Sequence, residues 1–183
     1  WNTVYLENHD QPRSVSRFGN DTQYHDESAK ALATLVLTLR GTPFLYEGQE
    51  IGMTNFDFSG MEKVQDVESI NIWNMGKQLH LPRSLRWRMI KTKSRDNART
   101  PMQWNDSPNA GFTTGTPWLS VNGNYPRINV AEQENAPNSV LAYYRQLIAF
   151  RNGSEILQAG DFSELYRKDG VYAYRRSLNV ESL

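Results

Sequence analysis

The sequence has no cysteine among its 183 residues, so it forms neither disulfides nor thiolate metal sites. It also has no excess charge, because 20 basic residues balance 20 acidic ones. This balance argues against nucleic acid as the main partner, and we expect no such partner. No apolar run approaches the roughly 18 residues of a transmembrane helix, so we expect no membrane partner either.

The sequence also shows no initiator methionine and no signal peptide, and Trp1 stands almost inside the first predicted strand. We therefore expect the sequence to be a piece of a longer protein, with an N-terminal part that precedes residue 1. The length allows one domain, or one domain and a fragment. A hydrophobic content of 38% is adequate for a packed core.

The chain is organised around the polar segment that follows its first apolar run. Thr3 to Leu6 is β-prone and is typical of a buried parallel strand. Asn8, His9, Asp10 and Arg13 follow, and this mixture of groups suits a site that holds several hydroxyls. In barrels and open α/β enzymes, such sites lie at the carboxyl ends of strands. The alternative is that Asn8 and Asp10 only cap the turn after the strand.

The next segments predict a βαβ unit. We expect a strand over residues 1–6, a long loop over 7–25 and a helix over 26–40, which ends at Gly41. A second strand is predicted over 42–46. Strand, helix and strand joined in this way imply that the two strands are parallel.

The remaining sequence alternates helices with ordered loops. Residues 54–93 hint at two short helices, and 94–126 read as a polar, ordered loop. Periodic apolar residues predict a helix over 139–152, which ends at Gly153. Lys168-Asp169-Gly170 between two β-prone runs predicts a hairpin turn.

Four stretches resemble the oligo-1,6-glucosidase and α-glucosidase branch of the α-amylase superfamily (glycoside hydrolase family 13). They are Asn8 to Asp21, Thr42 to Met53, Asp66 to Asn71, and Ser94 to Trp104. In the second stretch, Glu47 and Gln49 are exchanged relative to the usual family pattern. The resemblance covers nearly the whole chain.

This resemblance implies an α/β fold: the C-terminal part of a (β/α)₈ TIM barrel, followed by the start of an antiparallel β domain. Residues 1–153 would supply barrel strands seven and eight with their helices. Residues 154–183 would begin a β-sandwich C-terminal domain. Two strands cannot close a barrel, so we expect an exposed apolar face.

The resemblance also implies a sugar site without cofactor or metal. Asp10 would be a catalytic carboxylate that stabilises the transition state by holding hydroxyls of the glucosyl ring, with His9 binding the same hydroxyls. Arg95 is the candidate for a further substrate-binding residue that closes the pocket, and Arg99 is the less favoured choice.

A purely structural alternative exists for both arginines. Each could form a surface ion pair with Asp96 or Asp106, because such pairs are common and contribute little.

The implied activity is that of an exo-acting, retaining α-glucosidase that cleaves α-1,6 or α-1,4 bonds of small oligosaccharides in the cytoplasm. The nucleophile and the acid/base belong to family motifs that do not occur here, and Glu132, Glu134 and Glu155 stand in unrelated contexts. We therefore expect the chain alone to be inactive. Dextran glucosidase and trehalose-6-phosphate hydrolase remain alternatives within the family. A non-catalytic scaffold like the heavy chains of amino-acid transporters is the alternative outside it.

Overall fold

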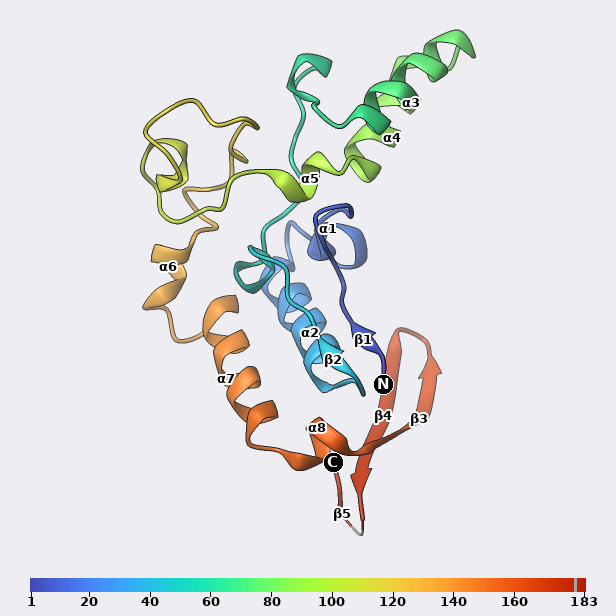
Figure 1. Ribbon diagram of the computed structural model, residues 1–183, viewed down its shortest axis with the longest axis vertical. Coiled ribbons are helices and arrows are strands. Elements are labelled where there is room, and N and C mark those ends of the chain that lie inside the picture. Colours follow the sequence, from blue (N-terminus) through green and yellow to red (C-terminus); the bar gives the residue numbers. More distant parts are fainter. Residues whose placement is uncertain (180) are drawn as a thin grey trace.

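The computed structural model describes residues 1–179 and 181–183. The molecule is elongated, with a helical projection at one end and a β-hairpin at the other (Figure 1). The elements in chain order are β1 (Thr3–Val4), α1 (Ser14–Phe18), α2 (His25–Thr38), β2 (Thr42–Pro43), α3 (Val67–Gln78), α4 (Arg83–Lys93), α5 (Asp96–Arg99), α6 (Val130–Glu134), α7 (Val140–Asn152), α8 (Glu155–Ala159), β3 (Asp161–Lys168), β4 (Val171–Leu178) and β5 (Glu181–Ser182). Short 3₁₀ turns occur at Gln49–Ile51, Met61–Lys63 and Pro108–Gly111.

The predicted parallel pairing of the first two strands is confirmed. Thr3 lies opposite Thr42 and Val4 opposite Pro43 in a parallel pair. The regular ladder is shorter than predicted, with two residues in each strand. The expected loop over 7–25 is interrupted by α1, a helix of 5 residues whose single turn leaves no periodic signal in the sequence.

The helix between the strands ends earlier than predicted. It closes at Thr38, and Leu39 is already extended. Gly41 therefore does not cap the helix. It has φ +139°, and a Cβ at this position would lie 2.6 Å from the carbonyl oxygen of Asn2. The glycine is needed because the chain passes so close to β1.

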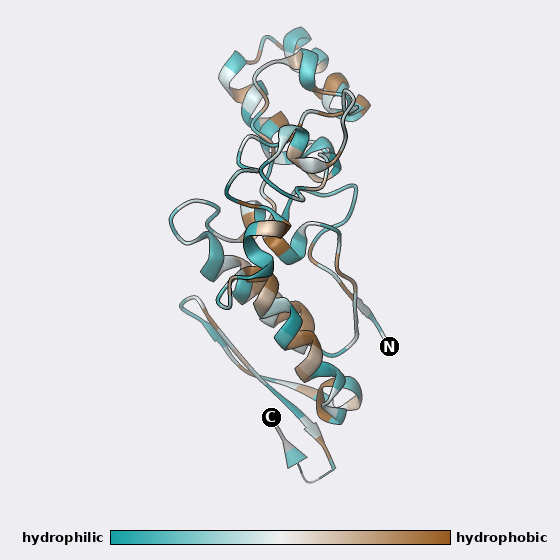
Figure 2. Ribbon diagram, turned by 90° about the vertical axis from the view of Figure 1, so that its left-hand side faces the viewer, coloured by the Kyte–Doolittle hydropathy of each residue, from teal (hydrophilic) through white to brown (hydrophobic). Residues whose placement is uncertain are grey.

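The main core lies between α2 and α7. Its buried members are Val15, Ala29, Ala33, Val36, Leu37, Val140 and Tyr144. Figure 2 shows hydrophobic positions gathered along these central helices. The prediction of a helix over 139–152 is confirmed, because α7 begins after Ser139, whose Oγ accepts a hydrogen bond from the Ala142 N–H at 3.1 Å. Gly153 follows the helix as predicted, with φ −89° rather than a left-handed conformation.

The two helices hinted at in 54–93 are α3 and α4, which form the projection seen in Figure 1. Trp73 and Trp87 hold them together, with ring centroids 4.9 Å apart. Asp66 caps the N-terminus of α3 by accepting a hydrogen bond from the Glu68 N–H. The chain then returns through α5 to the central part of the molecule.

The C-terminal hairpin is confirmed. Asp169 and Gly170 both have positive φ values, 54° and 76°, as a two-residue hairpin turn requires. β3 and β4 pair antiparallel, with an irregularity between Glu164 and Tyr166. Arg176 fixes the hairpin to α2 by donating a hydrogen bond to the carbonyl oxygen of Thr38 at 2.7 Å.

An apolar face is exposed beside β1 and β2, and an exposed apolar face was expected from the sequence. Trp1, Tyr5, Phe44 and Leu45 are all exposed there. Part of this face forms an open hollow of about 290 Å³. Within the described residues, none of the helices has the length and hydrophobicity needed to cross a lipid bilayer.

Candidate functional site

The chain turns sharply where it leaves β1. The side-chain oxygen of Asn8 accepts a hydrogen bond from the Asp10 N–H at 2.9 Å, and the Asn8 carbonyl accepts one from the Gln11 N–H at 3.2 Å. Asn8 is therefore the residue that caps this turn. The turn leaves the side chains of His9 and Asp10 68% and 47% exposed, with His9 Nε2 3.2 Å from Asp10 Oδ2.

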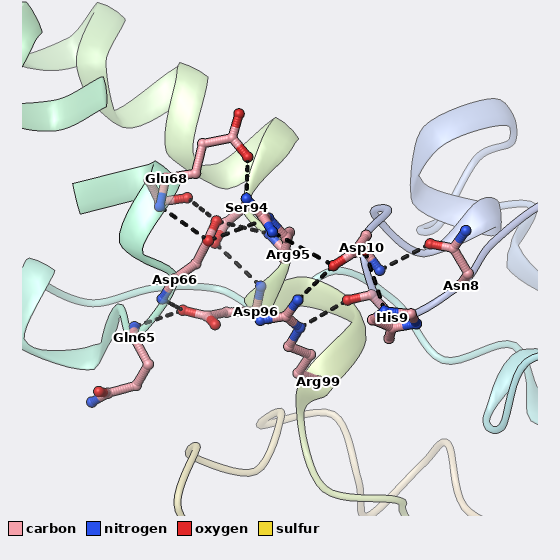
Figure 3. A network of polar contacts seen from close by, with 11 residues as sticks. Asn8, His9, Asp10, Gln65, Asp66, Glu68, Ser94, Arg95, Asp96 and Arg99 are labelled. Carbon is pink, nitrogen blue, oxygen red and sulfur yellow. Dashed lines mark hydrogen bonds and ion pairs between the residues drawn. The ribbon is translucent and has the colours of Figure 1, made fainter. Parts of the chain in front are cut away.

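Two arginines face the Asp10 carboxylate (Figure 3). Arg99 Nη2 lies 2.6 Å from Asp10 Oδ1, and Arg99 Nε donates to the carbonyl oxygen of His9 at 2.8 Å. Arg95 Nη1 is farther away, 3.7 Å from the same Oδ1. The sequence thus brings together residues that lie 85 to 89 positions apart along the chain.

Arg95 is bound mainly by carboxylates at the start of α3. Its Nη2 donates to Glu68 Oε2 at 2.5 Å, and its Nε lies 3.4 Å from Asp66 Oδ1. The hydrogen bond to Glu68, followed by the charge of Asp66, raises the pKa of the Arg95 guanidinium above its usual value. Arg95 therefore joins the projecting helix pair to the strand end that carries Asp10.

Asp66 is a buried carboxylate of this network. Burial raises its pKa, but hydrogen bonds from Ser69 Oγ and from the Arg95 and Glu68 N–H groups more than offset that effect, so the net pKa is lowered. It stays ionised and holds the backbone of Arg95 through a 3.2 Å hydrogen bond. An open hollow of about 600 Å³ lies next to this point and is lined by residues of α3 together with Arg95.

A buried ion pair supports the site from beneath. Glu7 and Arg13 are each 1% exposed, with Arg13 Nη1 3.5 Å from Glu7 Oε2. Burial raises the pKa of Glu7, and the Arg13 charge and the Ser14 hydroxyl lower it in part. Arg13 also donates to the carbonyl oxygens of Glu47 at 2.6 Å and Ala98 at 3.2 Å. It thereby connects the segment after β1 with the loop after β2 and with α5.

The predicted site residues Asp10, His9 and Arg95 lie together, and Arg99 lies closer to Asp10 than Arg95 does. The ion pairs considered for the arginines as a structural alternative are not those observed. Asp96 accepts hydrogen bonds from backbone N–H groups, and Asp106 is exposed.

Sequence reasoning missed several members of the network. Asp66 and Glu68 stand in a stretch that resembles the family's insert, but nothing in their spacing pointed to Arg95. Arg13 was grouped with the residues of a hydroxyl-binding site, but its side chain is 1% exposed and pairs with Glu7, so it supports the site instead of lining it. Its burial depends on the carbonyl oxygens of Glu47 and Ala98, which lie more than 30 residues away.

Comparison with known proteins shows the family to which the chain belongs. The catalytic-domain description of the Alpha-amylase family ("Alpha amylase, catalytic domain") matches residues 1–160. An oligo-1,6-glucosidase of Halalkalibacterium halodurans is 47% identical over 184 residues, covering 100% of this chain and 33% of the relative. A trehalose-6-phosphate hydrolase of Bacillus subtilis is 42% identical over 184 residues, with the same two coverages.

The structural comparison gives the same result. The crystal structure of isomaltulose synthase from Erwinia rhapontici matches with a TM-score of 0.94 and 47% identity, over 100% of this chain and 33% of that one. The chain thus spans about a third of the length of the curated relatives it matches. The resemblance read from the sequence motifs is confirmed, and the chain belongs to the alpha-amylase family.

Proposed function

We propose that the whole protein carrying this chain is an exo-acting, retaining α-glucosidase that hydrolyses α-1,6 bonds of small oligosaccharides. The observation that carries the proposal is the Asp10 carboxylate, which is 47% exposed at a strand end, bound by Arg99 at 2.6 Å and flanked by Arg95 at 3.7 Å. A full-coverage relative named oligo-1,6-glucosidase, at 47% identity, supports the choice of linkage.

Retaining hydrolysis uses two carboxylates about 5 Å apart, one as nucleophile and one as acid/base. We propose that both lie outside these 183 residues, and that Asp10 is a third carboxylate that binds the sugar. Carboxylate oxygens have several acceptor sites, so Asp10 retains capacity for sugar hydroxyls beside its contacts with Arg99 and His9. Hydrogen bonds to the 2-hydroxyl strengthen as the ring flattens, so they favour the transition state over the ground state.

His9 and Arg95 would bind substrate from either side of Asp10. His9 is 68% exposed and its Nε2 lies beside Asp10 Oδ2, from where an N–H can donate to the same hydroxyls. Arg95 is 35% exposed, and its fork already spans Glu68 and Asp66. A guanidinium placed between carboxylates can also hold a sugar hydroxyl and close one end of the pocket, so that substrates enter end-on.

The same proposal assigns the elements of the fold. β1 and β2 would be strands seven and eight of a (β/α)₈ barrel formed by residues 1–153, and residues 154–183 would begin a β-sandwich domain. The parallel pairing of β1 with β2 supports this assignment. So does the apolar face beside them, which further strands would cover.

Alternative activities differ in their support. Trehalose-6-phosphate hydrolase is favoured by a relative of that name at 42% identity, and a glucan 1,6-alpha-glucosidase of Streptococcus pneumoniae is 46% identical. Cleavage of α-1,4 bonds, like the cytoplasmic location, stays a prediction. A non-catalytic scaffold has no need for the exposed Asp10 carboxylate or for the arginines that hold it.

The test is hydrolysis of isomaltose, maltose, trehalose 6-phosphate and p-nitrophenyl α-glucoside by the purified whole protein. We expect fastest release of glucose from isomaltose, as the α-anomer. Asp10→Asn should lower kcat/KM on the order of 10²–10³-fold, as loss of a group that stabilises developing charge does. Asp106→Asn, at an exposed position away from the network, is the matched control.

Two results would count against the proposal. A whole protein that hydrolyses none of these glucosides refutes the assigned activity. Glucose release by the isolated 183-residue chain would show that the nucleophile and the acid/base lie within it.

A further inference from the structure

We propose that Arg99 is the positioning residue of Asp10: it fixes the carboxylate from a buried anchor formed by α5 and takes no direct part in binding the sugar. This inference rests on the proposed function, because Asp10 must be the sugar-binding carboxylate for its positioning to affect the rate.

The contacts of Arg99 fix both the backbone and the side chain of the strand end. Nη2 binds Asp10 Oδ1 at 2.6 Å, while Nε binds the carbonyl oxygen of His9 at 2.8 Å. Two donors of one planar group thus hold two consecutive residues, which leaves the carboxylate little freedom to rotate. Figure 3 shows the guanidinium directed at this turn from α5.

Arg95 does not provide the same restraint. Its Nη1 is 3.7 Å from Asp10 Oδ1, beyond hydrogen-bond distance, whereas its Nη2 is 2.5 Å from Glu68 Oε2. The two arginines therefore have different binding partners. Arg95 binds the start of α3, and Arg99 binds Asp10.

The helix that carries Arg99 is unusually well anchored for four residues. The three residues before it, Asp96, Asn97 and Ala98, are at most 1% exposed. Each is bonded to a different part of the chain. Asp96 Oδ2 accepts from the Gln65 and Asp66 N–H groups, Asn97 Oδ1 accepts from the Phe56 N–H, and the Ala98 carbonyl accepts from Arg13 and from the Tyr46 hydroxyl.

These hydrogen bonds fix the position of α5, and with it Arg99, relative to the turn that carries Asp10. The Ala98 carbonyl ties α5 to the segments after β1 and β2, so Arg99 cannot move independently of them. A misplacement of about 1 Å at a reacting centre can lower a rate about 10²-fold. Loss of the Arg99 fork should therefore reduce turnover even though the fork does not touch the sugar.

The experiment uses the whole protein with Arg99→Ala and Arg99→Lys, and measures kcat and KM on p-nitrophenyl α-glucoside. Arg145→Ala is the matched control, because Arg145 forms an exposed ion pair with Glu134 at 2.8 Å on another part of the molecule. We expect Arg99→Ala to lower kcat about 10²-fold with a smaller change in KM. Arg99→Lys keeps the charge without the fork and should fall between Arg99→Ala and the wild type. Arg145→Ala should match the wild type.

Two further readouts separate positioning from a general loss of structure. Guanidinium ion at millimolar concentration should restore part of the activity of Arg99→Ala, which it cannot do for a misfolded protein. In an Asp10→Asn background, Arg99→Ala should cause little further loss, because residues that act as one unit are not additive. If Arg99→Ala does not fold, the Arg99→Lys variant carries the same comparison.

The outcomes are distinct. An active wild type, an inactive Asp10→Asn and an Arg99→Ala within about 3-fold of wild type would overturn the inference and leave the proposed function standing. The inference would also be overturned if the loss of activity in the Asp10→Asn/Arg99→Ala double variant equalled the product of the two single losses. A wild type without α-glucosidase activity would overturn both.

Discussion

The substitution Arg13→Met tests how far the site depends on one buried cation. Arg13 is 1% exposed, and it pairs with Glu7 while donating to the carbonyl oxygens of Glu47 and Ala98. Methionine keeps an unbranched apolar stem in place of the arginine stem but has no charge and no donors, and it leaves the space of the guanidinium group empty. The variant therefore leaves the Glu7 carboxylate buried without its counter-ion.

Removing one partner of a buried ion pair typically lowers the free energy of unfolding by about 3–5 kcal/mol. We expect a loss in this range for Arg13→Met at pH 7.5. The upper end applies if Glu7 stays ionised, and the lower end applies if it takes up a proton. The double variant Glu7→Gln/Arg13→Met should recover a large part, because no buried charge remains and Ser14 Oγ can still donate to the amide oxygen.

The loss should depend on pH in a defined direction. Burial holds the pKa of Glu7 above its usual value of 4.5 in the folded protein. Between the unfolded and the folded pKa, the folded state binds more protons, so stability decreases as the pH rises through this interval. Without Arg13 the folded pKa rises further and the interval widens upward. The effect of Arg13→Met should therefore be largest near neutral pH and shrink as the pH falls toward 4.5.

The assay is urea-induced unfolding of the whole protein at several pH values, followed by tryptophan fluorescence. Arg17→Met is the matched control, since Arg17 is exposed on α1 and contacts Gln11 at 3.2 Å. We expect the control to change stability by less than about 0.5 kcal/mol. A loss below about 1 kcal/mol for Arg13→Met, or an equal loss at pH 5 and pH 7.5, would refute the reasoning.

Two further predictions concern local structure, and thermal unfolding checks both. Ser139→Ala removes the N-cap of α7 and should lower stability by about 1 kcal/mol. Ser139→Thr should retain the cap, because it keeps a hydroxyl that can accept from the Ala142 N–H and donate to the Gln133 carbonyl oxygen, and equal effects of the two would contradict the capping role. Gly48→Ala should destabilise more than Gly170→Ala. Both have positive φ, but a Cβ at Gly48 would overlap the sulfur of the buried Met53, while the space around Gly170 is open. Similar losses at the two positions would therefore contradict this packing argument.

The sequence predicted the elements whose signals are local and repeated. Helix α7 has several turns of periodic apolar residues, and the hairpin has Asp169-Gly170 between two β-prone runs. The helix was expected within a residue of its observed limits, and the hairpin turn lies between β3 and β4 where it was expected. The short helices α1 and α5 were missed, because one helical turn is too short to show a period.

The site was predicted in part for a related reason. Asp10 and His9 are adjacent and follow a strand, so a local pattern together with the family motif was enough to propose them as neighbours in one site. The relative distances of Arg95 and Arg99 from Asp10 depend on how α5 is anchored, and that anchoring uses segments distant in sequence. No periodicity encodes such contacts. The same holds for Arg13, which the sequence grouped with the polar residues of the site and which is buried in a pair with Glu7 instead.

The most direct test of the account is a crystal structure of the whole protein with a bound glucose-configured iminosugar. The account predicts that both oxygens of the Asp10 carboxylate lie within about 2.5–3.2 Å of ligand hydroxyls, with Arg99 still bound behind it. A ligand bound with no hydrogen bond to Asp10 would contradict the claim that this aspartate holds the sugar.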